Sequence, residues 1–288
     1  MQELTGLGSI LRGIGLLYWL IAIGAVALAI WKGKGWERKA LWSGVAIVVF
    51  GFLPVKAAIE QAQREAYARE AWAYFKKKCD TEAGEKIYKI FTGVKSVLVV
   101  KPLPPATDRD HYDQYWYGDP YSASANSVRT EVATTILAWT DGPISRTERG
   151  RGFDYVESVV SGKEGQSKTY IRYSYPKGSR NHVSEFVERP TSRFGVSWED
   201  ISTPEDRKYW VAASRLTVLD LTDNSIVAER IGFLIEAGFG STAGGRRPWL
   251  AARGFGQNGR SCPPVHDYSD RWFLLRVFKP TEENRDGK

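Results

Sequence analysis

The chain has 288 residues, 43% of them apolar and 13% aromatic, which is enough to build a packed core. Its formal charge of +7 suggests a nucleic-acid partner, but residues 1–78 hold 11 of the 40 Lys/Arg and 5 of the 33 Asp/Glu, which leaves 29 and 28 for the remainder. A nucleic-acid-binding domain carries a basic stripe in its own fold, so the nearly neutral remainder argues against such a partner.

Two apolar runs predict a transmembrane helical hairpin over residues 1–55. Residues 13–31 contain no charge, and a helix needs about 20 apolar residues to cross the hydrocarbon core. The second run, residues 40–55, is shorter and is extended by apolar residues if Lys56 snorkels. A cleaved signal peptide is the alternative for the first run. The apolar part of a signal peptide is about 7–15 residues long, however, and residues 13–31 form a longer run. Small residues would allow the two helices to pack closely: Ala25, Ala29, Gly44 and Gly51.

The link between the two runs predicts the orientation in the membrane. It carries four basic residues: Lys32, Lys34, Arg38 and Lys39. Short loops rich in Lys and Arg stay in the cytoplasm, so both termini are expected outside it. The sequence therefore predicts a bacterial inner-membrane protein with two spans and a large periplasmic domain. Lys56, Arg64 and Arg69 after the second run are a counter-signal.

A helical stalk is predicted over residues 56–78, which are rich in the strong helix formers Ala, Glu, Gln, Arg and Lys. Glu60–Arg64 and Glu65–Arg69 are spaced as i,i+4 ion pairs in the favourable order. The second span is expected to continue into this helix, with a bend near Pro54. An oligomerising stalk and a helix lying on its own domain or on the membrane surface both remain open.

Residues 79–280 predict an α+β extramembrane domain built on a mainly antiparallel sheet. A hairpin is expected over residues 214–238, because apolar and polar residues alternate around the turn formers Asp223 and Asn224. Thr203 and Pro204 predict the start of a helix. Residues 105–130 are expected to form a long loop and residues 281–288 a polar tail. The other predicted strands are residues 94–100, 153–160, 168–175, 193–198 and 271–278.

Cys79 and Cys262 are the two cysteines, one at each end of this domain. Outside the cytoplasm an even pair of cysteines predicts a disulfide. Two unrelated buried thiols are the alternative, and the number and spacing of Cys and His residues match no zinc site.

The sequence predicts no catalytic residue, no metal site and no cofactor. His111 lies among Asp108, Asp110 and Asp113, but the glycine and final glutamate of a calcium loop are missing. His266 is followed by Asp267, a pair that can orient a base and that also occurs by chance. A non-enzymatic protein is therefore favoured.

The most unusual local sequence is the glycine-rich stretch of residues 238–249. Its glycines can place backbone N–H groups in a nest for an anion, backed by arginines, whereas a structural loop with positive φ angles is the alternative. We predict an interaction loop here, made of Gly240, Ser241, Thr242, Gly244, Gly245, Arg246, Arg247 and Trp249.

Three stretches carry a resemblance: CDTEAGEKIY (79–88), RFGVSWEDISTPEDRKYWVAASRLTVLDL (193–221) and GSTAGGRRPWLAA (240–252). They resemble a family of uncharacterised bacterial membrane-anchored proteins with two spans and a periplasmic domain. That family has no assigned activity, so the resemblance implies the architecture and no catalytic residues.

These features predict an envelope protein whose periplasmic domain binds another protein. An immunity protein against a secreted toxin is its sharpest form, by analogy of architecture alone. The alternatives are an anchored enzyme acting on envelope lipid or peptidoglycan, and a structural subunit of an envelope complex. The expected partners are the lipid bilayer and a protein, and the sequence leaves the oligomeric state open.

Overall fold

The structure is a computed structural model that describes residues 4–32, 35–101, 107–116, 118, 120–121, 136, 153–160, 169–176, 181–254, 260–264 and 270–279. The chain forms two compact units, residues 1–67 and residues 68–288. We call the first the helical unit and the second the sheet domain. The boundary falls inside a helix, so the last turns of that helix belong to the sheet domain.

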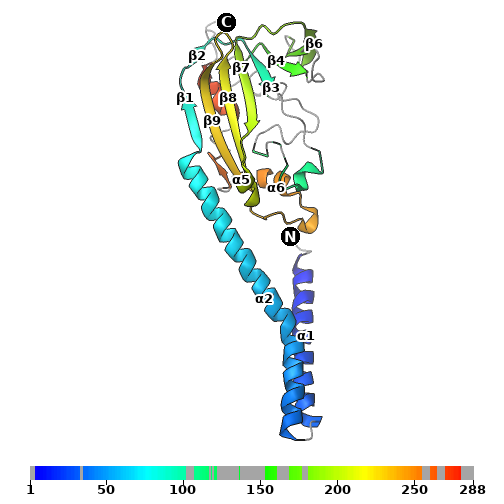
Figure 1. The fold of residues 1–288 in the computed structure, drawn as a ribbon. Coiled ribbons are helices and arrows are strands. Elements are labelled where there is room, and N and C mark those ends of the chain that lie inside the picture. Colours follow the sequence, from blue (N-terminus) through cyan, green and yellow to red (C-terminus); the bar gives the residue numbers. More distant parts are fainter. Residues whose placement is uncertain are drawn as a thin grey trace. The chain divides into compact units, whose positions relative to one another are not determined.

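Two long helices supply the helical unit (Figure 1): α1 (Leu4–Lys32) and most of α2 (Trp36–Thr81). Both contain a stretch long and apolar enough to cross a membrane. Only 6% of the residues in the α1 window are buried inside the protein, and none in the α2 window. α2 is one helix of 46 residues with Pro54 inside it, so the second apolar run does continue into the predicted stalk.

A hydrogen bond from α1 compensates for the proline in α2. Pro54 has no N–H, so the carbonyl of Phe50, four residues earlier, loses its helical donor. The Tyr18 hydroxyl donates to this carbonyl, and the Tyr18 and Phe50 rings lie edge to face with centroids 6.0 Å apart. Gly44 and Gly51 take no part in close packing, because a Cβ added at either would meet no atom within 4 Å. The predicted role of these two glycines is therefore wrong.

We expect Tyr18→Phe to weaken the pairing of α1 with α2 by about 1 kcal/mol, because the freed carbonyl lies in apolar surroundings. Pro54→Ala restores the backbone N–H, so the double variant should recover most of the loss. Energy transfer between labels on the two helices, followed during an SDS titration, measures the effect. If Tyr18→Phe costs as much in the Pro54→Ala background as in the wild type, the hydroxyl does not serve this carbonyl.

The described remainder of the sheet domain contains strands and short helices. The strands are β1 (Gly84–Ile87), β2 (Phe91–Thr92), β3 (Ser96–Lys101), β4 (Tyr155–Val160), β5 (Thr169–Ser174), β6 (Val183–Val187), β7 (Phe194–Asp200), β8 (Val211–Asp220), β9 (Ser225–Ile235), β10 (Ser261–Cys262) and β11 (Phe278–Lys279). The helices are η1 (Asp110–Tyr112), α5 (Pro204–Lys208), η3 (Ala243–Gly245), α6 (Pro248–Gly254) and α7 (Asp270–Val277).

One mixed sheet dominates, in the order β1-β9-β8-β7-β3-β4-β5-β6, and β10 also pairs with β9. β3 runs parallel to both of its neighbours, β4 and β7, and the other pairs are antiparallel. β2 and β11 form a separate parallel pair. The α+β class with a mainly antiparallel sheet is therefore confirmed.

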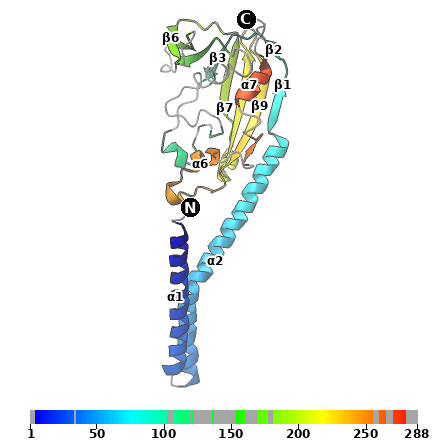
Figure 2. The same ribbon diagram turned by 180° about the vertical axis from the view of Figure 1, so that it is seen from behind.

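The two faces of the sheet carry different cores, because successive side chains of a strand point to opposite faces. Leu216 and Val218 of β8 belong to the larger core, which α7 covers (Figure 2). Val211 and Ala213 of the same strand point to the other face and belong to a smaller core. The buried residues of the larger core on α7 are Phe273, Leu274 and Val277.

The predicted strand at residues 271–278 is wrong, because this segment forms the helix α7 and only two residues of strand β11 follow. Phe273, Leu274 and Val277 are spaced for one face of a helix, and a short apolar run does not distinguish the two structures. The hairpin of β8 and β9 is confirmed, with Asn224 at φ 57° in its turn. The polar tail expected at residues 281–288 lies outside the described residues.

Candidate functional site

The last turns of α2 are fastened to one face of the sheet. Ala71 and Phe75 are buried against four residues of the smaller core: Val211, Ala213, Phe233 and Ile235. Burying a Phe side chain stabilises the folded state by about 1.5–3 kcal/mol. We call this apolar contact of Ala71 and Phe75 with β8 and β9 the seam. It holds the end of α2 on these two strands within the sheet domain.

Asp206 adds a polar attachment beside the seam. It completes a capping box at the predicted start of α5, in which the Thr203 hydroxyl accepts from the Asp206 N–H and the Asp206 carboxylate accepts from the Thr203 N–H. The same carboxylate accepts from the Tyr74 hydroxyl at 2.8 Å and lies 3.8 Å from the Lys78 ammonium. Burial raises the pKa of the Tyr74 phenol, and the hydrogen bond to Asp206 raises it further, so Tyr74 stays protonated.

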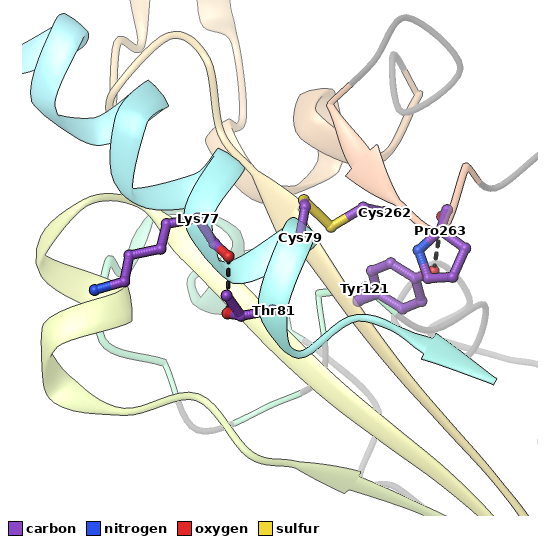
Figure 3. Close-up of a disulfide and its surroundings, with 6 residues drawn as sticks. All are labelled: Lys77, Cys79, Thr81, Tyr121, Cys262 and Pro263. Atoms are coloured by element: carbon purple, nitrogen blue, oxygen red, sulfur yellow. Dashed lines mark hydrogen bonds between the residues drawn. A yellow bond between two sulfur atoms is a disulfide. The ribbon is translucent and has the colours of Figure 1, made fainter. Parts of the chain in front are cut away.

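A cysteine pair forms the third attachment (Figure 3). Cys79 at the end of α2 and Cys262 in β10 lie at disulfide distance, consistent with the predicted link. β1 pairs with residues 228–231 of β9 and β10 pairs with residues 233–234. Both therefore lie along the edge of β9 that faces away from β8, and the cysteine pair links the helix to this edge.

The glycine-rich stretch of residues 238–249 surrounds a carboxylate of the chain itself. Glu236 is fully buried and accepts from the N–H groups of Gly238 at 2.8 Å and Gly240 at 2.7 Å. The Arg246 guanidinium donates to the same carboxylate. A Cβ at Gly240 would lie 2.3 Å from the Trp210 ring, so this position needs glycine. These N–H groups are therefore not available to an external anion.

The predicted interaction loop divides into an exposed tip and a buried base. Residues 241–245, which include Ser241, Thr242, Gly244 and Gly245, are exposed. Trp249 is 1% exposed, packs against the Trp210 ring with centroids 5.3 Å apart and planes tilted by 45°, and lies under the Arg207 guanidinium. Arg246 turns inward to Glu236, and Arg247 pairs with Asp108 at 2.8 Å. Only the tip and Arg247 are thus open to a partner.

Residues 107–116 lie beside this loop. The Trp249 indole donates to the Asp113 carbonyl at 2.8 Å, and the Gln114 amide donates to the carbonyls of Arg207 and Lys208. Tyr112 and Tyr115 in this segment are 44% and 52% exposed. We call residues 241–245 together with Tyr112 and Tyr115 the loop surface.

The acidic residues around His111 do not converge on a cation. Asp108 pairs with Arg247, Asp110 accepts from Thr107, and Asp113 accepts from the Tyr115 N–H. Hydrogen bonds from Thr107 lower the pKa of Asp110. Within the described part of the chain, no three His, Cys, Asp or Glu residues are grouped to hold a metal ion. His266 and Asp267 lie outside the described residues.

Glu157 is a buried anionic centre that the sequence did not predict. It lies on β4 and accepts from the N–H and hydroxyl groups of both Thr191 and Ser192, and from Arg172. Thr191 and Ser192 belong to the connection that leads from the edge strand β6 to β7. Because β5, β4 and β3 separate these two strands in the sheet, Glu157 on β4 holds a short connection that crosses three strands.

No family model, curated protein or solved structure matches this chain, so the fold and these sites are the basis for its proposed function.

Proposed function

We propose that this chain is a two-span protein of the bacterial inner membrane whose sheet domain lies in the periplasm and binds another protein. The observation that carries the proposal is the nature of the two long helices, whose apolar stretches are left unburied by the rest of the protein. Exposure of such an apolar surface to water is unfavourable, whereas the hydrocarbon core of a bilayer is itself apolar and is spanned by helices of this length. The basic link favours a position of the sheet domain outside the cytoplasm.

The buried carboxylates of the sheet domain support binding rather than catalysis. Each of them accepts hydrogen bonds from groups of the same chain. Glu157 thereby holds the connection from β6 to β7, Asp206 the end of α2, and Glu236 the glycine-rich loop. Such carboxylates stabilise a rigid domain, and a rigid domain can present a preformed surface. The cysteine pair adds a covalent link that suits the oxidising periplasm.

The loop surface is the region we propose for the protein partner. Tyrosine is enriched among residues that dominate binding energy, because its ring is large and loses little conformational entropy. Tyr112 and Tyr115 provide two such rings beside a tip whose main chain is accessible at Gly244 and Gly245. The segment is held by Trp249 and Gln114, so little ordering is required on binding.

Co-expression with the product of the neighbouring gene tests this proposal in its sharpest form, an immunity protein. The wild-type chain should form a complex with that product and rescue growth when the product is exported to the periplasm. Tyr112→Ala/Tyr115→Ala should lower the affinity at least about tenfold, since loss of a central aromatic costs roughly 2 kcal/mol or more. Tyr88→Ala, at a tyrosine 59% exposed and outside the loop surface, is the matched control. Absence of both complex and rescue would reject the immunity form.

A reporter fused after Lys288 tests the compartment separately. A reporter that is active only in the periplasm should give signal, and one that is active only in the cytosol should not. The reverse result would contradict the proposed orientation, whatever the outcome of the binding experiment.

A further inference from the structure

A groove runs between α1 and the first half of α2 in the helical unit. Its volume is about 610 Å³, within the range of about 300–1,000 Å³ that is usual for small-molecule sites. Apolar side chains line most of it: Ala25, Leu28, Ala29, Val45, Ala46, Val49 and Phe50. The alanines leave the space open, because their side chains end at Cβ.

Two cations stand at one end of this groove. Lys32 is the last residue of α1, and Arg38 lies in the first turn of α2, so both belong to the end beside the link. Trp42, one turn further along α2, also lines the groove, and tryptophan favours the headgroup level of a bilayer. The groove thus combines an apolar length with a cationic, interfacial mouth.

We propose that this groove binds an anionic phospholipid, with an acyl chain along the apolar length and the phosphate between Lys32 and Arg38. The inference rests on the proposed membrane anchoring. Charge complementarity selects the occupant, since basic pockets between membrane helices on the cytoplasmic side bind anionic headgroups. A guanidinium also binds phosphate oxygens in a bidentate manner, which an ammonium cannot do.

A second copy of the chain is a poorer occupant. Copies in one membrane share the same orientation, so a second hairpin would bring its own Lys32 and Arg38 to the level of the first pair. Like charges at that level repel each other, whereas an anionic lipid neutralises them.

The test uses the full chain reconstituted in vesicles of equal parts phosphatidylglycerol and phosphatidylcholine, extracted in mild detergent and analysed by native mass spectrometry. Each basic residue is expected to favour the anionic lipid about fivefold, so the wild type should retain phosphatidylglycerol roughly 25-fold over phosphatidylcholine. Lys32→Gln/Arg38→Gln should bring this ratio close to one. Lys39→Gln is the matched control, because Lys39 follows Arg38 directly and does not line the groove.

A second variant separates the groove from its charges. Ala29→Trp fills the apolar length and leaves both cations in place, so it should lower the total lipid retained. Equal retention of the two lipids by the wild type, or equal loss of selectivity in Lys39→Gln, would overturn the proposal. Disulfide-linked dimers of Ala29→Cys that exclude lipid would assign the groove to a second copy. Release of the wild type from vesicles by alkaline carbonate would instead remove the membrane anchoring itself, and the lipid site with it.

Discussion

Glu157→Gln is expected to destabilise the sheet domain by about 3 kcal/mol, because removing one partner of a buried, hydrogen-bonded charge pair costs about 3–5 kcal/mol. The amide keeps the size of the carboxylate, but its NH₂ group faces donors from Arg172, Thr191 and Ser192. The connection between β6 and β7 therefore loses the carboxylate that accepts from Thr191 and Ser192. Urea unfolding of the full chain in detergent, followed by near-UV circular dichroism, measures the change.

Glu185→Gln provides the matched control for this substitution. The Glu185 carboxylate contacts the same Arg172 guanidinium at 3.3 Å, but its side chain is 63% exposed, against 0% for Glu157. An exposed ion pair contributes about 0–1 kcal/mol. Similar losses in the two variants would show that burial of Glu157 and its contacts with Thr191 and Ser192 contribute nothing.

The Glu157 contribution should also depend on pH. Burial raises the pKa of Glu157, but hydrogen bonds from Ser192 and Arg172 outweigh it, so the folded-state pKa lies below the ordinary value. The unfolded chain titrates near the usual value of about 4.3. The folded state therefore binds this proton less readily, and the stabilisation is complete above about pH 5. It is lost as the pH falls through the folded-state pKa, so Glu157→Gln should lose less stability on acidification than the wild type.

The structure separates what local sequence predicts from what it does not. The β8–β9 hairpin and the Thr203 cap were predictable, because alternation and capping act over a few residues. No local pattern indicates that the Asp206 carboxylate also accepts a hydrogen bond from the Tyr74 hydroxyl, 132 residues away in sequence. The central position of β3, between strands from much later in the chain, is likewise a long-range result of packing.

The candidate sites show the same division. Glycines 238 and 240 indicated backbone N–H groups arranged for an anion, and they are so arranged, but the anion is Glu236 of the same chain. A nest that receives an internal carboxylate has the same glycine pattern as one that binds a ligand. Trp249 entered the predicted interaction loop because it follows this pattern, although its burial depends on a contact between α6 and Trp210, the residue before β8.

Loss of the Cys79–Cys262 link is expected to have the largest effect on the sheet domain. The two residues are 183 positions apart, and in the chain-entropy model a loop of that length contributes about 5 kcal/mol by constraining the unfolded state. Cys79→Ser/Cys262→Ser should therefore lower the urea midpoint strongly. The reductant TCEP should lower that of the wild type equally and leave the double variant unchanged.

The same pair reports on the compartment, because the cytoplasm keeps thiols reduced and the periplasm does not. In intact cells quenched with acid, a maleimide reagent should label neither cysteine of the wild type until a reductant is added. β10 consists of two residues, Ser261 and Cys262, so its pairing with β9 depends on this link. Cys262 lies opposite Phe233 in a hydrogen-bonded position of the ladder, so hydrogen exchange at the Cys262 amide should accelerate after reduction. Immediate labelling of both thiols would place the sheet domain in the cytoplasm. Faster exchange throughout β8 and β9 is expected as well, because the whole domain loses stability. Exchange at Cys262 that stays as slow as exchange in β8 and β9 after reduction would show that β10 keeps its pairing without the link.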